Sequence, residues 1–251
     1  SVLIMSPWNY PVQLTLIPLI GAIAAGNCTV VKPSEYAVHS AKVLAKLLWE
    51  IFDEKYVAVL LGGRAVNEAV LKERFDYIFF TGSPAVGSVV MEAAAKHLTP
   101  VTLELGGKSP CIVDKTADIK RAARRIVWGK FLNAGQTCVA PDYVLVQEEV
   151  KEPLLRKMKH YIRKMYRDEP LLNPEYPKII NEKHFNRLKK MLLEQDGEII
   201  TGGRMDADTL KIEPTLLAGL TERSKVMQEE IFGPVLPVFA YSDLAEVIRI
   251  L

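Results

Sequence analysis

The chain has 251 residues, of which 49% are hydrophobic and 25% are charged. This composition is typical of a soluble globular protein and excludes a disordered chain, and the length fits one large domain or two modest ones. Lys and Arg number 32 and Asp and Glu number 30, so the net charge is only +2. Such a balance does not indicate a nucleic-acid-binding protein, and we expect no nucleic acid partner.

The cysteines and histidines show no metal-binding pattern. Cys28, Cys111 and Cys138 are far apart and form no C-x-x-C motif, and the four histidines form no H-E-x-x-H motif. We therefore expect no metal site and no disulfide framework, and the thiols favour a reducing, cytoplasmic compartment. A free cysteine is more often a small core residue than a nucleophile, which is our expectation for Cys28 and Cys111.

Residues 1–31 carry no charged side chain, a feature that could suggest a membrane span. They contain three prolines and several glycines and amides, which a spanning helix would not usually tolerate, and no basic segment typical of a signal peptide. We predict a strand, a turn, a buried helix and a second strand. The chain starts without Met and stops on the apolar helical pattern of residues 244–251, so we expect it to be a piece of a longer polypeptide.

In the first part of the chain, short apolar runs alternate with helical patterns. The predicted strands are Val2–Met5, Cys28–Lys32, Tyr56–Leu61 and Asp76–Thr81. The predicted helices are Gln13–Ala25, Tyr36–Phe52, Asn67–Glu73 and Pro84–Lys96. This alternation indicates a parallel sheet with helices on both faces.

A second α/β region follows. Its predicted strands are Val101–Leu105, Cys111–Val113, Tyr143–Gln147, Ile199–Thr201 and Val235–Ala240, and its predicted helices are Asp118–Leu132, Glu152–Tyr166 and His184–Glu194. We place the domain boundary in the glycine loop after residue 105, which gives units 1–105 and 106–251. The basic helix Glu152–Tyr166 could bind a membrane surface or a partner, but the balanced charge favours a solvated face over a core stripe.

Two segments are candidates for nucleotide binding. Thr81–Gly87 forms a glycine-rich turn between a strand and a helix, where backbone N–H groups can bind a phosphate, or it is only a turn with a helix cap. Lys32 and Glu35 follow the second strand, at the strand end where open α/β sheets bind ligands. The lysine can reach a ribose or a phosphate and the carboxylate can accept ribose hydroxyls. Alternatively, Ser34 caps the next helix and Glu35 lies in its first turn.

Four residues are candidates for catalysis or for support of the site. Cys138 follows the small and polar residues 133–137, and such a loop can expose a thiol. Glu104 lies inside an apolar strand beside glycines; we expect it to be buried or half-buried and able to act as a base. Asn9 offers an amide donor in a turn between two prolines, and Glu230 precedes Ile-Phe-Gly-Pro.

Six segments occur in a fixed order, and together they are more specific than any one of them. They are Pro7–Pro11, Lys32–Glu35, Phe80–Gly87, Leu103–Lys108, Gly135–Cys138 and Glu229–Pro234. This set resembles the aldehyde dehydrogenase superfamily, and residues 97–106 and 136–144 are similar to its class-three branch. The resemblance implies a doubly wound parallel-sheet cofactor domain and an α/β catalytic domain, both incomplete here. It also implies that the family chain continues beyond both ends.

The resemblance further implies an activity: NAD(P)-dependent oxidation of medium- or long-chain aliphatic or aromatic aldehydes to carboxylic acids. Cys138 would be the nucleophile, Asn9 and the Cys138 N–H would hold the oxyanion, and Glu104 would activate water. Relatives that transfer the acyl group to coenzyme A generally lack this Glu, so its presence favours hydrolysis. A truncated, non-catalytic fragment is the other alternative.

The resemblance also assigns the cofactor contacts. They would come from Lys32, Glu35, Gly82, Ser83, Gly87, Glu230 and Phe232. Glu35 near the ribose 2′-hydroxyl would disfavour a 2′-phosphate and hence favour NAD, although the class-three branch also accepts NADP. The parent protein would be a homodimer, and any membrane contact would come from a C-terminal segment that this sequence lacks.

Overall fold

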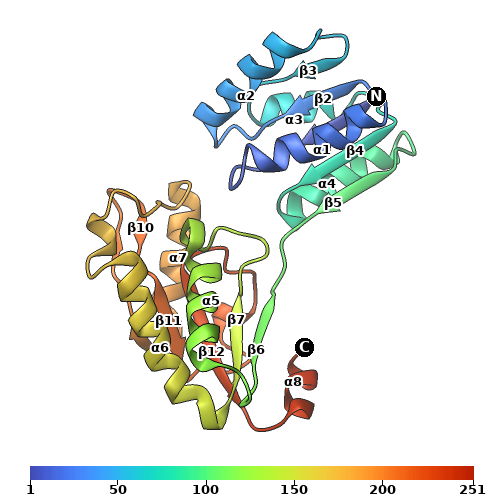
Figure 1. Ribbon diagram of the computed structural model, residues 1–251. Helices are drawn as coiled ribbons and strands as arrows, with labels where there is room; N and C mark the ends of the chain where they lie inside the picture. Colours follow the sequence, from blue (N-terminus) through green and yellow to red (C-terminus); the bar gives the residue numbers. More distant parts are fainter. The chain divides into compact units, whose positions relative to one another are not determined.

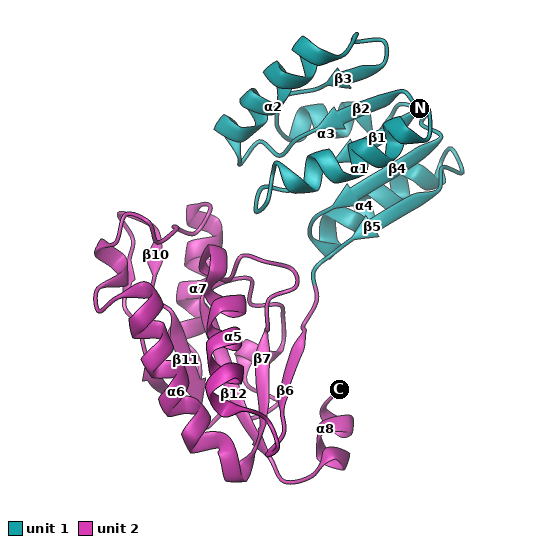
Figure 2. Ribbon diagram, viewed as in Figure 1, with its two compact units in different colours: residues 1–106 teal, residues 107–251 magenta.

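The computed structural model describes all residues, Ser1 to Leu251. The chain divides into two compact units, Ser1–Gly106 and Gly107–Leu251 (Figure 2). No helix is both long enough and apolar enough to cross a bilayer.

Unit 1 is a parallel sheet interleaved with helices (Figure 1). The strands are β1 (Val2–Met5), β2 (Thr29–Lys32), β3 (Val57–Val59), β4 (Tyr77–Thr81) and β5 (Val101–Glu104). The helices are α1 (Gln13–Ala24), α2 (Val38–Ile51), α3 (Arg64–Val70) and α4 (Pro84–Ala95). The strand order is β3-β2-β1-β4-β5, and every neighbouring pair is parallel.

Both faces of this sheet are covered. All four residues of β1 are buried, and alternate side chains enter different hydrophobic clusters. Ile4 packs in the cluster that holds residues of α1 and α2, whereas Leu3 packs in the cluster that holds residues of α3 and α4. The predicted doubly wound sheet is therefore confirmed. Because the winding reverses between β1 and β4, the carboxyl ends of these two strands flank the position where such folds bind ligands.

Unit 2 is a second α/β layer structure. Its main sheet has the order β6-β7-β12-β11-β8 and consists of β6 (Pro110–Val113), β7 (Tyr143–Gln147), β12 (Val235–Tyr241), β11 (Thr215–Ala218) and β8 (Glu198–Thr201). Only the β8–β11 pair is antiparallel in this sheet. The helices are α5 (Ile119–Phe131), α6 (Glu148–Tyr166), α7 (Glu182–Leu193) and α8 (Leu244–Ile250), and β9 (Met205–Asp206) pairs with β10 (Lys211–Ile212).

The core of unit 2 explains these elements. Val144 and Val146 of β7 pack with α5 and α6, whereas Tyr143 and Leu145 pack with Val247 of α8. Along α6 the apolar side chains are buried and the cations Arg156, Lys157, Lys159, Arg163 and Lys164 are exposed. This arrangement fits the interpretation of a solvated face over a core stripe.

Several elements differ from the sequence predictions. Strand β11, whose four residues are all buried, was not predicted. Helix α6 begins at Glu148 rather than at the predicted Glu152, so Pro153 lies inside the helix. Cys28 is exposed and not a core residue, because it lies in the turn before β2. Cys111 packs half-buried against the core, and burial raises the pKa of its thiol.

Two adjacent leucines of α2 test the assignment of its buried face. Leu48 is 2% exposed in the core, and Leu47 is 42% exposed. Leu48→Ala should lower the free energy of unfolding by about 2–5 kcal/mol because it leaves a cavity. Leu47→Ala should change it by at most about 0.5 kcal/mol. Urea unfolding followed by circular dichroism measures both, and equal effects would contradict this orientation of α2.

Candidate active site

The predicted site residues of unit 1 follow the carboxyl ends of four strands. Asn9 comes after β1, Lys32 ends β2, Ser83 follows β4 and Glu104 ends β5. Because all these strands are parallel and adjacent, the four segments lie along the same edge of the sheet. The fold thus brings together residues up to 95 positions apart in sequence (104 − 9).

Lys32 and Glu35 form a polar pair at this edge. The Lys32 side chain is almost completely buried, its Nζ donates to the carbonyl oxygen of Pro33 at 2.8 Å, and it lies 4.0 Å from Oε2 of Glu35. Burial lowers the pKa of Lys32, and the neighbouring carboxylate partly opposes this. Glu35 keeps a third of its side chain exposed, so its carboxylate remains accessible to a ligand.

The alternative role for this segment, a helix cap, is wrong. Helix α2 begins only at Val38, its N-cap is Ala37, and no side chain caps it. The Ser34 hydroxyl instead accepts a hydrogen bond from the N–H of Tyr36 at 3.3 Å. Glu35 therefore lies before the helix rather than in its first turn, and capping does not account for its presence.

The glycine-rich turn after β4 is built for close packing. The N–H of Gly82 donates to the carbonyl oxygen of Glu104 at 2.9 Å, and a Cβ on Gly82 would lie 2.5 Å from the Phe80 ring. A Cβ on Gly87 would lie 2.8 Å from the Leu105 side chain. Ser83 caps α4 by accepting from the N–H of Val86 at 3.4 Å. The predicted cap therefore exists, and phosphate binding by the same turn remains a prediction.

Glu104 is exposed, contrary to the expectation of a buried or half-buried side chain. It pairs with Thr81 in the last register position of β4 and β5, where the sheet ends and no core surrounds it. Asn9 is half-buried in the turn after β1. Burial therefore gives no support for Glu104 as a base, and its position at the strand end is the remaining structural argument.

Cys138 follows a strained turn in unit 2. After α5, Asn133 and Ala134 have φ of +52° and Gly135 has φ of +74°, a left-handed run in which Ala134 is completely buried. Left-handed backbone costs roughly 1–2 kcal/mol for each non-glycine residue. A Cβ on Gly135 would overlap the carbonyl oxygen of Gly233, so only glycine fits there. Cys138, half-buried, thus belongs to a loop that packs against the Glu229–Pro234 segment.

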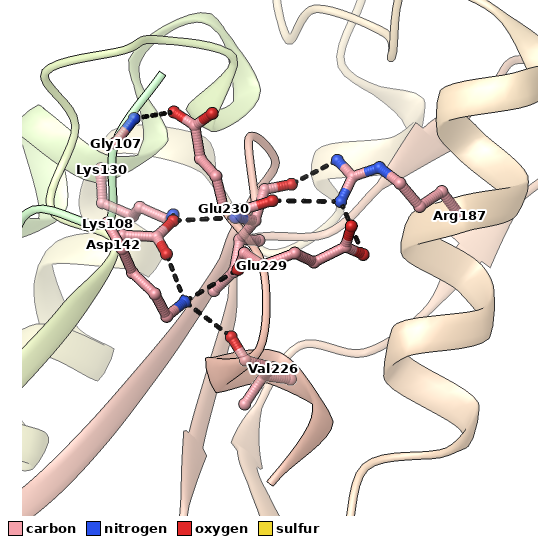
Figure 3. A network of polar contacts seen from close by, with 9 residues as sticks. Gly107, Lys108, Lys130, Asp142, Arg187, Val226, Glu229 and Glu230 are labelled. Atoms are coloured by element: carbon pink, nitrogen blue, oxygen red, sulfur yellow. Dashed lines mark hydrogen bonds and ion pairs between the residues drawn. The ribbon is translucent and has the colours of Figure 1, made fainter. Parts of the chain in front are cut away.

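The Glu229–Pro234 segment is itself held by a polar network (Figure 3). Lys108 Nζ contacts Asp142 Oδ2 at 2.6 Å and donates to the carbonyl oxygens of Val226 and Glu229 at 2.8 and 3.0 Å. Asp142 Oδ1 accepts from the N–H of Ile231 at 3.1 Å and lies 3.8 Å from Nζ of the buried Lys130. The carboxylate of Asp142 therefore links two lysines and the backbone of this loop.

Arg187 of α7 holds the same loop from a different element. Its guanidinium donates to the carbonyl oxygens of Glu230 and Ile231 at 3.2 and 2.5 Å and to the Glu229 carboxylate at 3.4 Å. Glu230 accepts from the N–H of Gly107 at 3.2 Å, and burial raises the pKa of its carboxyl. Phe232 has φ of +47°, a left-handed conformation that this anchoring must maintain.

Sequence reasoning assigned no role to four of these anchoring residues. Lys108 and Asp142 lie inside segments quoted for the resemblance, so their presence there is a signal that could have suggested a structural role. Lys130 and Arg187 lie in ordinary amphipathic helices, and no local pattern marks them. The structure places no group of three or more His, Cys, Asp or Glu side chains where they could hold a metal.

Comparisons with known proteins agree on one family. The sequence model of the Aldehyde dehydrogenase family matches residues 1–251. The chain is 52% identical to mouse aldehyde dehydrogenase family 3 member B2 over 99% of its length and 51% of that protein. It is 50% identical to 4,4′-diaponeurosporen-aldehyde dehydrogenase of Staphylococcus aureus, again over 99% of the chain, and covers 54% of that enzyme.

The solved structures agree with this result. The substrate-bound state of Staphylococcus aureus AldH superimposes with a TM-score of 0.95 at 50% identity, over 99% of this chain and 54% of that one. A Pseudomonas syringae aldehyde dehydrogenase in complex with NAD⁺ and octanal gives a TM-score of 0.90 at 30% identity, over 99% of this chain and 54% of that one. The chain thus spans about half the length of the relatives that it matches.

The buried Lys130 gives a prediction on stability and pH. Desolvation lowers its pKa from 10.5 to about 8, against the opposing effect of Asp142. Between these two pKa values the unfolded chain holds a proton that the native chain lacks. The free energy of unfolding of the wild type should therefore rise relative to Lys130→Met, by up to about 1.4 kcal/mol per pH unit.

Urea unfolding of both proteins at several pH values between about 8 and about 10 measures this difference. Lys159→Met, which removes an exposed lysine of α6, is the control and should follow the wild type. A difference between wild type and Lys130→Met that does not change with pH would contradict the lowered pKa.

Proposed function

Because this chain belongs to the aldehyde dehydrogenase family, we propose that the protein it forms, in whole or in part, oxidises aldehydes to carboxylic acids with a nicotinamide dinucleotide. The observation that carries the proposal is the Cys138 loop: a free, half-buried thiol on a strained turn that packs against the Glu230 segment. Backbone strain of this kind occurs mostly at functional sites.

The residues at the sheet edge of unit 1 fit a dinucleotide. Lys32 and the accessible carboxylate of Glu35 supply donors and acceptors suited to ribose hydroxyls, and the Ser83 turn leads into a helix N-terminus that suits a pyrophosphate. We propose that Gly82 and Gly87 let the backbone approach it, and that Glu230 and Phe232 contact the nicotinamide end. When bound, the cofactor would accept a hydride from the substrate carbon.

NAD rather than NADP is our preferred cofactor. A ribose 2′-phosphate would meet the negative charge of Glu35. Among solved relatives, one from Sinorhizobium meliloti is titled NAD-dependent and one from E. coli NADP dependent. Both cofactors thus occur among structurally similar enzymes, and the carboxylate of Glu35 favours NAD in this chain.

The proposed chemistry starts at Cys138. Its thiolate adds to the aldehyde carbon, and the carbonyl electron pair moves to oxygen, giving a thiohemiacetal alkoxide held by the Asn9 amide and the Cys138 N–H. Loss of hydride leaves a thioester. Glu104 takes a proton from water as the water oxygen attacks the thioester carbonyl, and the acid departs from the Cys138 sulfur. The exposed side chain of Glu104 is compatible with this role because its reactant is water.

The substrate class proposed is medium- or long-chain aliphatic or aromatic aldehydes. Relatives at 50–52% identity belong to aldehyde dehydrogenase family 3 or act on diaponeurosporen-aldehyde by name, and a more distant structure holds octanal. A reducing, cytoplasmic setting fits the three free thiols. Homodimerisation is proposed on the resemblance alone.

Removing the nucleophile tests the activity. Mixed with NAD and an aromatic aldehyde, the 251-residue chain should give a rapid burst of NADH absorbance, and Cys138→Ala should reduce it at least about 1000-fold, because no covalent adduct can form. Cys28→Ala removes an equally free but exposed thiol and should retain the burst. A burst that survives in Cys138→Ala would contradict the proposal. Its absence from wild-type chain shown to be folded by circular dichroism would contradict activity of this chain alone and limit the proposal to the longer protein.

Removing the proposed base separates the two half-reactions. Glu104→Gln should keep the NADH burst and slow steady-state turnover by about 10²–10⁴-fold, since only thioester hydrolysis needs the base. Mass spectrometry should then detect an acyl group on Cys138. Glu92→Gln, on the exposed surface of α4, is the control. Unchanged turnover in Glu104→Gln, or a coenzyme A thioester as the main wild-type product, would overturn this assignment.

A further inference from the structure

The three left-handed residues before Cys138 need an external support. Asn133, Ala134 and Gly135 all have positive φ, and two of them are not glycine. Such a conformation persists only where neighbouring contacts enforce it. The contact of Gly135 with Gly233 supplies steric complementarity, but it contains no directional bond. Within the turn, the Asn133 amide donates to the carbonyl oxygen of Gln136 at 3.3 Å, and the N–H of Gln136 donates to the carbonyl oxygen of Asn133 at 3.1 Å. These bonds do not connect the turn to another segment.

The side chain of Gln136 connects the turn to a second segment. Gln136 is 3% exposed, lies directly between the left-handed run and Thr137-Cys138, and uses both ends of its amide. Nε2 donates to the carbonyl oxygens of Asn133 and Lys178, both at 3.1 Å. Oε1 accepts from the N–H of Ile180 at 2.9 Å. One side chain therefore closes the turn on itself and ties it to a segment more than 40 residues away in sequence.

The far end of this link is rigid. Ile179 is fully buried, and its N–H donates to the carbonyl oxygen of Leu210 at 2.9 Å. The next residues lead into α7, whose N-cap Asn181 accepts from the N–H of His184 at 3.0 Å. These contacts hold the Lys178–Ile180 segment from outside the cysteine turn. Through its hydrogen bonds to this segment, Gln136 fixes the position of the cysteine loop.

We propose that Gln136 is a positioning residue for Cys138: its amide holds the left-handed turn in register with the Lys178–Ile180 segment and so fixes where the thiol lies. The inference rests on the proposed function for its catalytic consequence. Its structural half, control of the thiol through the turn, can be measured without any enzyme activity.

Loss of the link should affect two properties in opposite directions. Gln136→Met keeps the length of the side chain and removes all three hydrogen bonds, so the turn opens more often and exposes the thiol. Alkylation of Cys138 by iodoacetamide should become about tenfold faster. The aldehyde-dependent NADH burst should become about 100-fold slower with KM changed less, because a displacement of about 1 Å costs this much in aligned chemistry.

Two comparisons separate positioning from general loosening. Alkylation of Cys111, half-buried in the same unit, should stay at the wild-type rate in Gln136→Met. Asn181→Ala removes the cap of α7 next to the same anchor and should lower stability without changing Cys138 alkylation or the burst by more than about threefold. Faster alkylation of both thiols, or the same effects in Asn181→Ala, would overturn the proposal.

A conservative variant gives a pH signature. In Gln136→Glu the ionised carboxylate would face the carbonyl oxygens of Asn133 and Lys178, whereas the protonated form keeps one donor and the acceptor for Ile180. Relative to wild type, its alkylation rate should return toward normal as the pH falls from about 8 to about 6. Gln136→Met should show no such recovery. Parallel pH profiles for the two variants would contradict the assigned hydrogen bonds.

The outcomes distinguish this inference from the proposed function. A wild-type chain without an NADH burst, but with Cys138 alkylation that depends on Gln136, refutes the proposed activity for this chain alone and supports the structural link. A normal burst and a normal alkylation rate in Gln136→Met support the proposed activity and refute the positioning role.

Discussion

The candidate nucleophile loop and the adjacent Glu229–Pro234 segment both depend on the contacts of the Asp142 carboxylate. It is nearly fully buried, contacts Lys108 and Lys130, and accepts the N–H of Ile231. A buried charge of this kind is costly unless it is paired and hydrogen-bonded, and here Lys108, Lys130 and the N–H of Ile231, from three separate segments, meet both requirements. Since Lys130 lies in the last turn of α5, directly before the cysteine turn, the same carboxylate fixes the start of that turn and the Glu229–Pro234 segment.

Unit 1 obeys a different constraint, that of parallel strands. A parallel sheet places every carboxyl end on one edge, so the segments after β1, β2, β4 and β5 share that edge whatever their sequence separation. The side chains there need little burial to be near one another. Glu104 is the last residue of β5, a strand predicted to be buried. Because the strand ends there, at the edge where the proposed site lies, its side chain is exposed.

Periodicity was sufficient to predict most elements of this fold, and β1, β7 and α4 begin where the pattern placed them. It missed β11 and placed the start of α6 four residues too late. For the candidate site, residue types marked Cys138 and Glu230 but not their supports. The contacts of Arg187 and Gln136 join residues more than 40 positions apart, and Lys130 lies in an ordinary amphipathic helix. No local sequence pattern encodes such pairings.

Two loops where reactive groups are proposed contain three of the six non-glycine residues with positive φ: Asn133, Ala134 and Phe232. The other three, Leu98, Arg167 and Leu210, lie elsewhere in the chain. In the two loops, the neighbouring Gly135 and Gly233 permit backbone contact so close that any Cβ would prevent it. Two strained loops in direct contact can hold each other in a single arrangement only if each is also tied to the core. Gln136 provides this tie for one loop, and Arg187 and Asp142 provide it for the other. Weakening either tie should therefore disturb both loops, so Cys138 and Glu230 are expected to be displaced together rather than independently.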